Sequence, residues 1–248
     1  MKSYRIIRLL AYIISTYCFL PSFYFRKISP CVKRRFNYSK NIFLTFDDGP
    51  NATYTLEILD LLKKYEVKAT FFVVAKKAKE NKTIVSRMIK DGHNLGLHSY
   101  SHKNAWLRTP WQTKLDFQQS IEIFKELDYQ IKYYRAPWGI FNPFTYYYSN
   151  KFGLKSILWT NLTNDWNPNA KVDKIVDNIF DNLQGGDIIV FHDSNHNSDN
   201  DNGAPRNTIQ VLNIILPALI KKGFHFQTLE KGMGNHVNEQ TSQSGISI

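Results

Sequence analysis

The stretch NIFLTFDDGP, residues 41–50, ends an apolar run abruptly at two adjacent carboxylates. Residues 42–46 are apolar or β-branched, which is typical of a buried β-strand. A buried strand cannot hold an unpaired charge without a large desolvation cost. Asp47 and Asp48 therefore need partners from elsewhere in the chain, and the glycine and proline that follow them predict a turn.

Similar apolar or β-branched runs recur along the chain. They lie at residues 42–46, 67–74, 94–97, 131–134, 155–160, 187–191 and 224–229. Helical periodicities separate most of them, as at 110–127, where Pro110 suits a helix start, and at 172–183, before two glycines. Seven strands that alternate with helices predict an α/β fold with a parallel sheet, open or closed.

The positive charge of the chain is concentrated at its N-terminus. The 248 residues carry a net charge of +11, and residues 1–40 contain nine of the 32 Lys and Arg and none of the 21 acidic residues. The rest of the chain, with 23 basic and 21 acidic residues, is nearly neutral. This distribution argues against nucleic-acid binding and favours a membrane as the partner of the N-terminal segment.

An apolar run from Leu9 to Phe25 follows Arg5 and Arg8 and is typical of a signal peptide or an uncleaved signal anchor. No A-x-A-like cleavage site is evident, which favours an anchor. Basic residues at 26–35 also follow the run and, by the positive-inside rule, argue against an extracytoplasmic domain. A third reading is an N-terminal helix buried in the domain.

The two cysteines, Cys18 and Cys31, lie in this N-terminal region. Disulfides therefore do not hold the domain together, and any metal site in it must use His and carboxylate ligands.

Five of the predicted strands are followed by chemically capable side chains. These are Asp47 and Asp48 after the first, His98 and His102 after the third, Arg135 after the fourth, Asp165 and Trp166 after the fifth, and His192 after the sixth. The carboxyl ends of parallel strands face one side of a sheet, where active sites of α/β folds are built. We therefore expect these residues to converge.

Such a group could perform metal-assisted hydrolysis of an acyl bond. His98 and His102, at spacing i, i+4, can bind one metal together with a carboxylate, and a zinc-bound water has a pKa near ~7. One of the two aspartates would bind the metal, and the other would act as general base with Arg135 to orient it. His192 would be the general acid, with Asp165 holding its tautomer.

Each motif taken alone has an ordinary structural explanation. An HxxxH pair is often a surface or capping pair, DDG is a common turn, and a histidine at a strand end can simply satisfy the backbone. We interpret His93 in this structural way. The joint placement of the motifs after successive strands is what favours a functional interpretation.

The motifs TFDDGP, HSYSH, RAPWG, NDW and VFHDS, in this order, closely resemble those of carbohydrate esterase family 4, the polysaccharide deacetylase (NodB-homology) family. The resemblance covers roughly residues 40–230. It implies a distorted (β/α) barrel with about seven parallel strands. It also implies hydrolysis of N-acetyl, and sometimes O-acetyl, groups of sugar polymers with a divalent metal, usually zinc.

The resemblance also implies a role for each matching position. Asp47 corresponds to the base, Asp48, His98 and His102 to the metal ligands, Arg135 to the partner of the base, and Asp165 to the residue that tunes the acid His192. Trp138 corresponds to the position whose backbone N–H helps to form the oxyanion hole. Trp166 and Val190 correspond to positions that line the pocket for the acetyl methyl group.

Three positions depart from the usual family pattern. Leu162 replaces the first Asp of a D-x-x-D-W motif, Val190 replaces leucine, and Trp138 replaces tyrosine. None of these changes removes a ligand, the base or the acid, so we expect an active enzyme.

We expect an N-terminal signal or anchor segment (1–25), a basic linker (26–40), a catalytic domain (41–232) and a polar, disordered tail (233–248). The expected protein is a monomer, membrane-anchored or secreted, with an extracytoplasmic catalytic domain. Its expected substrate is an N-acetylglucosamine polymer such as peptidoglycan. The alternatives are a deacylase or deformylase of a lipid-linked sugar and a non-catalytic glycan-binding protein.

Overall fold

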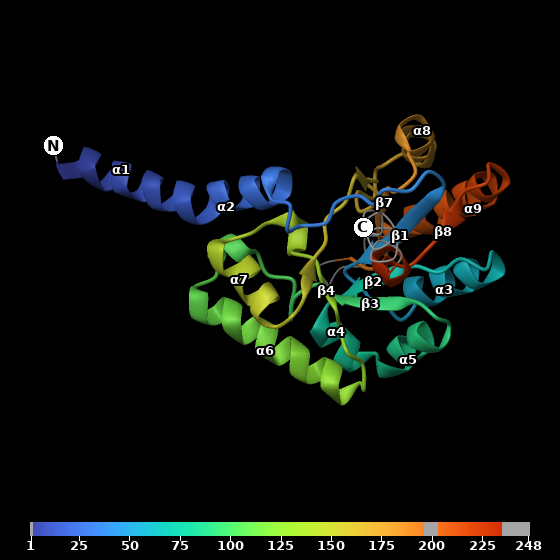
Figure 1. Ribbon diagram of the computed structural model, residues 1–248, viewed down its shortest axis with the longest axis horizontal. Helices are drawn as coiled ribbons and strands as arrows, with labels where there is room; N and C mark the ends of the chain where they lie inside the picture. Colours follow the sequence, from blue (N-terminus) through green and yellow to red (C-terminus); the bar gives the residue numbers. More distant parts are fainter. Residues whose placement is uncertain (1, 196–202, 235–248) are drawn as a thin grey trace, which may run out of the picture. The chain divides into compact units, whose positions relative to one another are not determined.

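The computed structural model describes residues 2–195 and 203–234 (Figure 1). Its strands are β1 (Asn41–Asp47), β2 (Thr70–Val73), β3 (Asn94–Leu97), β4 (Tyr133–Tyr134), β5 (Lys155–Ser156), β6 (Asn161–Leu162), β7 (Ile188–His192) and β8 (His225–Phe226). They follow the order β5-β4-β3-β2-β1-β7-β6, and β8 also pairs with β1. The pairings of β1 with β2, β7 and β8 are parallel, as are β3–β4, β4–β5 and β6–β7. The predicted parallel sheet is confirmed.

Helices connect most of these strands. They are α3 (Tyr54–Lys64), α4 (Ala75–Glu80), α5 (Lys82–Lys90), α6 (Pro110–Glu126), α7 (Pro143–Lys151), α8 (Val172–Asn182) and α9 (Pro205–Lys221), with short 3₁₀ turns η3 (Ala105–Leu107) and η4 (Pro137–Gly139). Helix α6 begins where the sequence predicts, because Thr109 and Gln112 form a reciprocal capping box before and after Pro110. Asn142 caps α7 in the same way.

The chain forms two compact units. The first contains the described residues of 1–33, 73–80 and 96–158, and the second contains those of 34–72, 81–95 and 159–248. In the first unit, α6 packs on α4 and α7, and Phe117 contacts the ring of Tyr134. In the second unit, α9 packs on α3 and α8, and β1 pairs with β7 over its buried length.

Of the predicted strand at 155–160, only Lys155–Ser156 forms a strand (β5), and a second short strand, β6, begins just after the predicted range at Asn161. β5 belongs to the first unit and pairs with β4, whereas β6 belongs to the second unit and pairs with β7. The chain changes its pairing partner after Ser156, and a run of apolar letters carries no sign of that change. The described sheet therefore has eight strands.

A long helical segment precedes the sheet. It consists of α1 (Lys2–Ile14), the π-helical turn η1 (Ser15–Phe19), α2 (Leu20–Phe23) and a second π-helical turn η2 (Tyr24–Ile28). Within the described residues, Tyr4–Ile28 is the one helix long and apolar enough to cross a membrane. Most of its apolar side chains are exposed, unlike those of a buried core helix.

Part of the predicted linker, residues 26–40, is packed into the fold. Phe36 is 2% exposed, its ring lies 4.1 Å from that of Phe43, and its N–H donates to the carbonyl of Gly186 over 2.8 Å. Gly186 has a φ of +87°, and a Cβ there would come within 2.0 Å of the Phe36 carbonyl oxygen. Of the predicted tail, residues 235–248 lie outside the described residues, as do residues 196–202 of the long polar loop.

Because Phe36 is buried, its substitution should strongly lower stability, although the sequence alone suggests that residues 26–40 are a linker. Phe36→Ala should lower the free energy of unfolding by about 3–5 kcal/mol, because it empties a packed aromatic site. Urea unfolding of the full chain would measure it. The matched control is Asn37→Ala, an exposed neighbour that should change the value by less than about 0.5 kcal/mol. Equal effects of the two substitutions would contradict the packing.

Candidate active site

The register of β1 and β7 brings Asp47 beside His192. The two residues are partners in the parallel ladder, at the carboxyl ends of their strands. Partners in a parallel ladder point to the same face of the sheet, and Val190, two residues before His192, shares that face. Asp47 is 3% exposed, and Val190 is buried. The predicted base, the predicted acid and one predicted pocket residue therefore lie on one face at one sheet edge.

The carboxylate of Asp165 is fully buried and is surrounded by hydrogen-bond donors. Its Oδ1 lies 2.8 Å from Nδ1 of His192, and its Oδ2 accepts from the His192 backbone N–H over 2.7 Å. The hydroxyls of Thr163 and Thr208 donate to Oδ1 and Oδ2 over 2.9 Å and 2.5 Å. These contacts fix the position of the Asp165 carboxylate. Because a carboxylate oxygen accepts hydrogen bonds, Nδ1 of His192 carries a proton, and Nε2 remains on the side of the ring away from Asp165.

These contacts also set the charge of His192. Burial of the imidazole by itself lowers its pKa, but the charge and hydrogen bond of Asp165, with the charges of Asp48 and Asp47, raise the pKa of His192 from 6.5 to about 9. The ring is therefore protonated at neutral pH, which is the state that a general acid needs.

The loop that carries His98 and His102 is fixed at several points. Nδ1 of His98 lies 2.9 Å from the carbonyl oxygen of Arg135, which leaves Nε2 as the ligand atom. The N–H of His102 donates to the Ser99 hydroxyl over 2.7 Å, and the N–H of Tyr100 donates to Oδ1 of Asp116 over 3.0 Å. Asp116 is buried on α6 and pairs with Arg108 at 3.0 Å.

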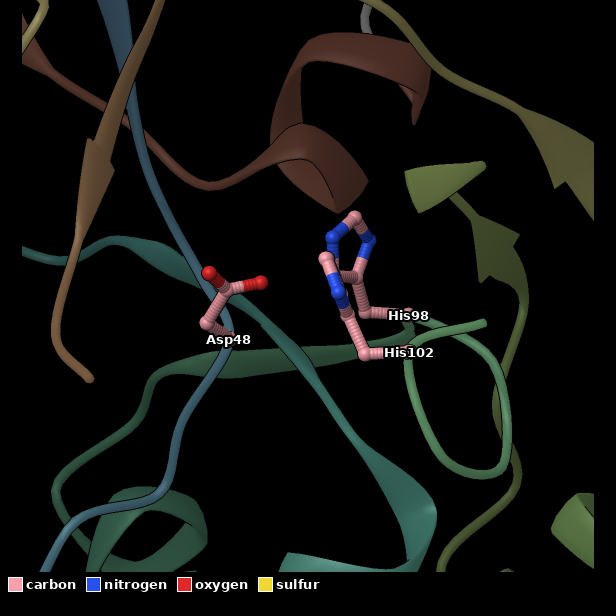
Figure 2. A group of neighbouring side chains, drawn as sticks. All are labelled: Asp48, His98 and His102. Carbon is pink, nitrogen blue, oxygen red and sulfur yellow. The ribbon is translucent and has the colours of Figure 1, made fainter. Parts of the chain in front are cut away.

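Three side chains form the candidate metal centre (Figure 2). Asp48, His98 and His102 each offer one ligand atom, and these atoms lie within 4.8 Å of one another. Figure 2 shows the carboxylate of Asp48 turned toward the two imidazole rings. Two imidazole nitrogens and one carboxylate oxygen are a donor set that suits a divalent ion with open positions for water and substrate. The chemistry of these residues therefore fits a metal.

The remaining predicted residues are buried or half-exposed near these groups. The side chain of Arg135 is fully buried and donates from Nη2 to the carbonyl of Leu158 over 3.2 Å; its pairing with Asp47 stays a prediction. Trp138 is 44% exposed and places its ring 4.3 Å from that of His102. Trp166 is 42% exposed, with its ring 5.3 Å from that of His192.

Left-handed backbone conformations are concentrated in the motifs. In the described residues, five of the seven non-glycine residues with positive φ belong to them: Asp48 (76°), Ser99 (70°), His102 (51°), Trp138 (53°) and Asn164 (61°). This conformation costs roughly 1–2 kcal/mol per residue for a side chain with a Cβ. Such strain persists where the surrounding contacts over-determine it and is typical of functional sites.

Sequence reasoning missed three residues that support the site. Thr163 and Thr208 hold Asp165, and Asp116 holds the histidine loop. Only Asp116 left a signal in the sequence, as an acidic residue directly before the apolar Phe117 on a helix stripe.

Comparison with known proteins places the chain in a family. Residues 36–157 match the family described as polysaccharide deacetylase. A peptidoglycan-N-acetylglucosamine deacetylase of Bacillus cereus is 31% identical over 197 residues, which cover 79% of this chain and 89% of that protein. A chitooligosaccharide deacetylase of Sinorhizobium fredii is 30% identical, with 76% and 90% covered. The chain belongs to the polysaccharide deacetylase family.

The fold agrees with this assignment. The crystal structure of a peptidoglycan N-acetylglucosamine deacetylase in complex with 4-naphthalen-1-yl-N-oxidanyl-benzamide superposes with a TM-score of 0.74 at 30% identity, and the match covers 81% of this chain and 92% of that one. A family 4 acetyl xylan esterase from Clostridium thermocellum, solved with a cobalt ion, gives a TM-score of 0.68 at 29% identity, with 79% and 91% covered. The predicted distorted (β/α) barrel is confirmed.

The environment of His192 predicts how its pKa responds to substitution. Asp165→Asn removes the two largest interactions that raise the pKa of His192, the charge and the hydrogen bond of Asp165. The pKa should therefore fall from about 9, because burial is then opposed only by the charges of Asp48 and Asp47. Titration of the imidazole signals by NMR in chelator would measure the shift. His93, whose pKa burial lowers to about 4, provides a second histidine that should stay silent above pH 6 in both proteins. An unchanged His192 pKa in the variant would contradict the assignment.

The same shift links stability to pH. The folded-state pKa of about 9 lies above the ordinary 6.5, so the stabilisation is complete below pH 6.5 and is lost as pH rises through 9. The metal-free wild type should therefore lose unfolding free energy between these values, with a slope of at most about 1.4 kcal/mol per pH unit. Urea unfolding at several pH values should give a flatter profile for Asp165→Asn, and parallel profiles would refute the linkage.

Proposed function

We propose that this protein is a metal-dependent deacetylase that hydrolyses N-acetyl groups of N-acetylglucosamine-containing cell-surface polymers, with peptidoglycan as the first candidate. The observation that carries this proposal is that Asp47 and His192 are neighbours in the β1–β7 ladder at the carboxyl ends of their strands, with the pKa of His192 raised to about 9. The candidate metal ligands support it, as does the similarity of the chain to a peptidoglycan-N-acetylglucosamine deacetylase and a chitooligosaccharide deacetylase.

Asp48, His98 and His102 would hold the metal, most suitably zinc. When bound, the ion supplies Lewis acidity and lowers the pKa of water to near ~7. Asp47 takes the proton of the water that attacks the acetyl carbonyl, and buried Arg135 orients this carboxylate. The backbone N–H of Trp138 stabilises the developing oxyanion.

His192 completes the reaction by protonating the departing amine nitrogen. The carbon–nitrogen bond breaks, and acetate and a free amino sugar result. Asp165 keeps the imidazole oriented for this transfer through its contact with Nδ1. Val190 and Trp166 line the side on which the acetyl methyl group lies.

The domain organisation follows from the same proposal. Residues 41–232 form the catalytic domain of a monomer that acts outside the cytoplasm, and residues 1–25 attach it to the membrane. Residues 26–40 connect the two, and residues 233–248 form a polar tail.

A second candidate is a deacylase of a lipid-linked sugar. The observation that favours it is the packing of the N-terminal helix against η3, which begins three residues after His102. Such contact would suit a substrate that is presented at a membrane surface.

Acetate release by the full chain in detergent tests the proposal. The substrates are N-acetylglucosamine oligomers, peptidoglycan and a detergent-dispersed lipid-linked saccharide, each with zinc and with chelator. We expect zinc-dependent release from oligomers or peptidoglycan. Release from the lipid-linked saccharide alone would favour the second candidate, and glycan binding without release by zinc-loaded protein would indicate a binding protein.

Asp47→Asn tests the assignment of the base. The variant should lower kcat by roughly 10²–10⁴-fold, because it loses proton transfer. Its zinc content, measured by atomic emission, should match that of the wild type, because Asp48 provides the carboxylate ligand. Asn37→Ala is the control for handling and folding. Full activity of Asp47→Asn would refute the role of Asp47, and loss of zinc would reassign it as a ligand.

Trp138→Ala tests whether the backbone of this residue matters rather than its ring. The variant keeps the N–H, so acetate release should remain within about tenfold of the wild type, well below the effect of an oxyanion-hole donor loss of roughly 10²–10³-fold. Steady-state kinetics on N-acetylglucosamine oligomers would measure it. A loss of kcat as large as that of Asp47→Asn would show that the indole itself is required.

A further inference from the structure

The N-terminal helix is hydrogen-bonded to the unit that carries His98 and His102. Ser22 is buried, and its hydroxyl accepts from Nε1 of Trp106 over 2.9 Å and from the N–H of Phe141 over 3.0 Å. The same hydroxyl donates to the carbonyl oxygen of Phe141 over 2.7 Å. One turn earlier, the hydroxyl of Tyr17 donates to the carbonyl oxygen of Arg108 over 2.5 Å.

Aromatic contacts extend this attachment along the helix. The ring of Phe19 lies 4.9 Å from that of Trp106, and the ring of Phe25 stacks on Tyr146 at 4.6 Å. Phe25 also lies 5.3 Å from Phe141. The part of the helix from Tyr17 to Phe25 is therefore packed as an element of the domain, and a flexible tether would have no such contacts.

This packing limits how the helix can sit in a membrane. From Lys2 to Thr16, the helix before these contacts is about 22 Å long at 1.5 Å per residue. The hydrocarbon core of a bilayer is about 30 Å thick. The undocked part is too short to cross it, so a spanning helix must carry its docked part into the membrane interface, together with the residues that it touches.

The residues beside the docked helix suit that position. Leu107, between Trp106 and Arg108, is 84% exposed, and Trp111 at the start of α6 is 64% exposed. Exposed Phe19, Leu20 and Phe23 continue the apolar surface on the helix. Nζ of Lys114 lies 5.3 Å from the centroid of the Trp111 ring and supplies a cation for lipid phosphate. Tryptophan flanked by lysine is typical of the headgroup region.

We propose that the N-terminal helix, Leu107 and Trp111 form one membrane-facing surface whose partner is a phospholipid bilayer. This inference rests on the proposed membrane attachment and adds that the attachment is rigid. Trp106 is four positions after His102, so at most about 14 Å of chain joins the histidine to a residue that contacts the docked helix. The candidate metal centre is then held close to the lipid surface.

A fluorescent probe at position 107 tests the surface. In the full chain with Cys18→Ala and Cys31→Ala, Leu107→Cys carries an environment-sensitive nitrobenzoxadiazole dye, and the protein is reconstituted into phosphatidylcholine–phosphatidylglycerol vesicles. The dye should lose about half or more of its emission when the vesicles contain nitroxide-labelled lipid, because it lies at the interface. The matched control is Lys125→Cys, exposed near the far end of α6 and about 21 Å along the helix from Trp111, where quenching should be slight.

Ser22→Leu tests whether docking positions the surface. Leucine keeps the helix apolar, but it cannot fill the three hydrogen bonds of the buried hydroxyl, so quenching at position 107 should fall. Asn37→Ala, an exposed substitution outside the proposed surface, should leave quenching unchanged. If Ser22→Leu has no effect while position 107 is quenched, the rigid attachment through Ser22 is wrong.

Flotation with the vesicles separates the two levels of the proposal. Protein that does not float contradicts the membrane attachment itself. If the protein floats but the dye at position 107 is not quenched, the surface inference alone is wrong. If the emission of that dye also shifts without quenching, position 107 contacts a second copy of the chain instead of lipid. Acetate release in detergent is read independently of these outcomes.

Discussion

The parallel pairing of β1 with its neighbours is the constraint on which the site depends. β1 is bonded to β2, β7 and β8, and its residues from Ile42 to Asp47 are buried. A shift of one residue in the β1–β7 register would turn Asp47 to the other face of the sheet. The apolar side chains of both strands oppose that shift, because they are buried on both faces of the sheet and the shift would disrupt their packing. The β1–β7 register thus determines both the packing of the core and the positions of Asp47 and His192.

Around that pair, the protein holds polar groups in places that are costly unless they are satisfied. Asp165 is fully buried, and four hydrogen bonds stabilise it there. They come from the hydroxyls of Thr163 and Thr208 and from the backbone N–H and Nδ1 of His192. In return, its charge keeps His192 protonated. The left-handed residues of the motif loops carry a further cost in backbone strain. Rigid strands and buried hydrogen bonds maintain that strain, which fixes the directions of the side chains.

The N-terminal segment extends this reasoning from the site to its location. Composition alone marks it as apolar and suggests a tether followed by a linker. In the folded chain, Ser22 and Phe25 are bonded to or packed on one unit, and Phe36 is packed in the other. A segment held in this way orients what it is attached to, so the position of the histidine loop relative to a lipid surface becomes a property of the fold.

Much of this fold could be predicted from the sequence, because the hydrophobic period of each segment and the positions of the motifs along the chain can be read directly from it. The alternating strands and helices and the start of α6 at Pro110 were predictable from the residue pattern. The convergence of His98 and His102 with an aspartate followed from their positions after successive strands, and the family resemblance identified that aspartate as Asp48. Two features were not predictable: the end of β5 at Ser156 with a separate β6 from Asn161, and the support of Asp165 by Thr208 from α9. These features depend on which distant segments pair and on which hydroxyl meets which carboxylate, and only the packed tertiary structure brings such groups together.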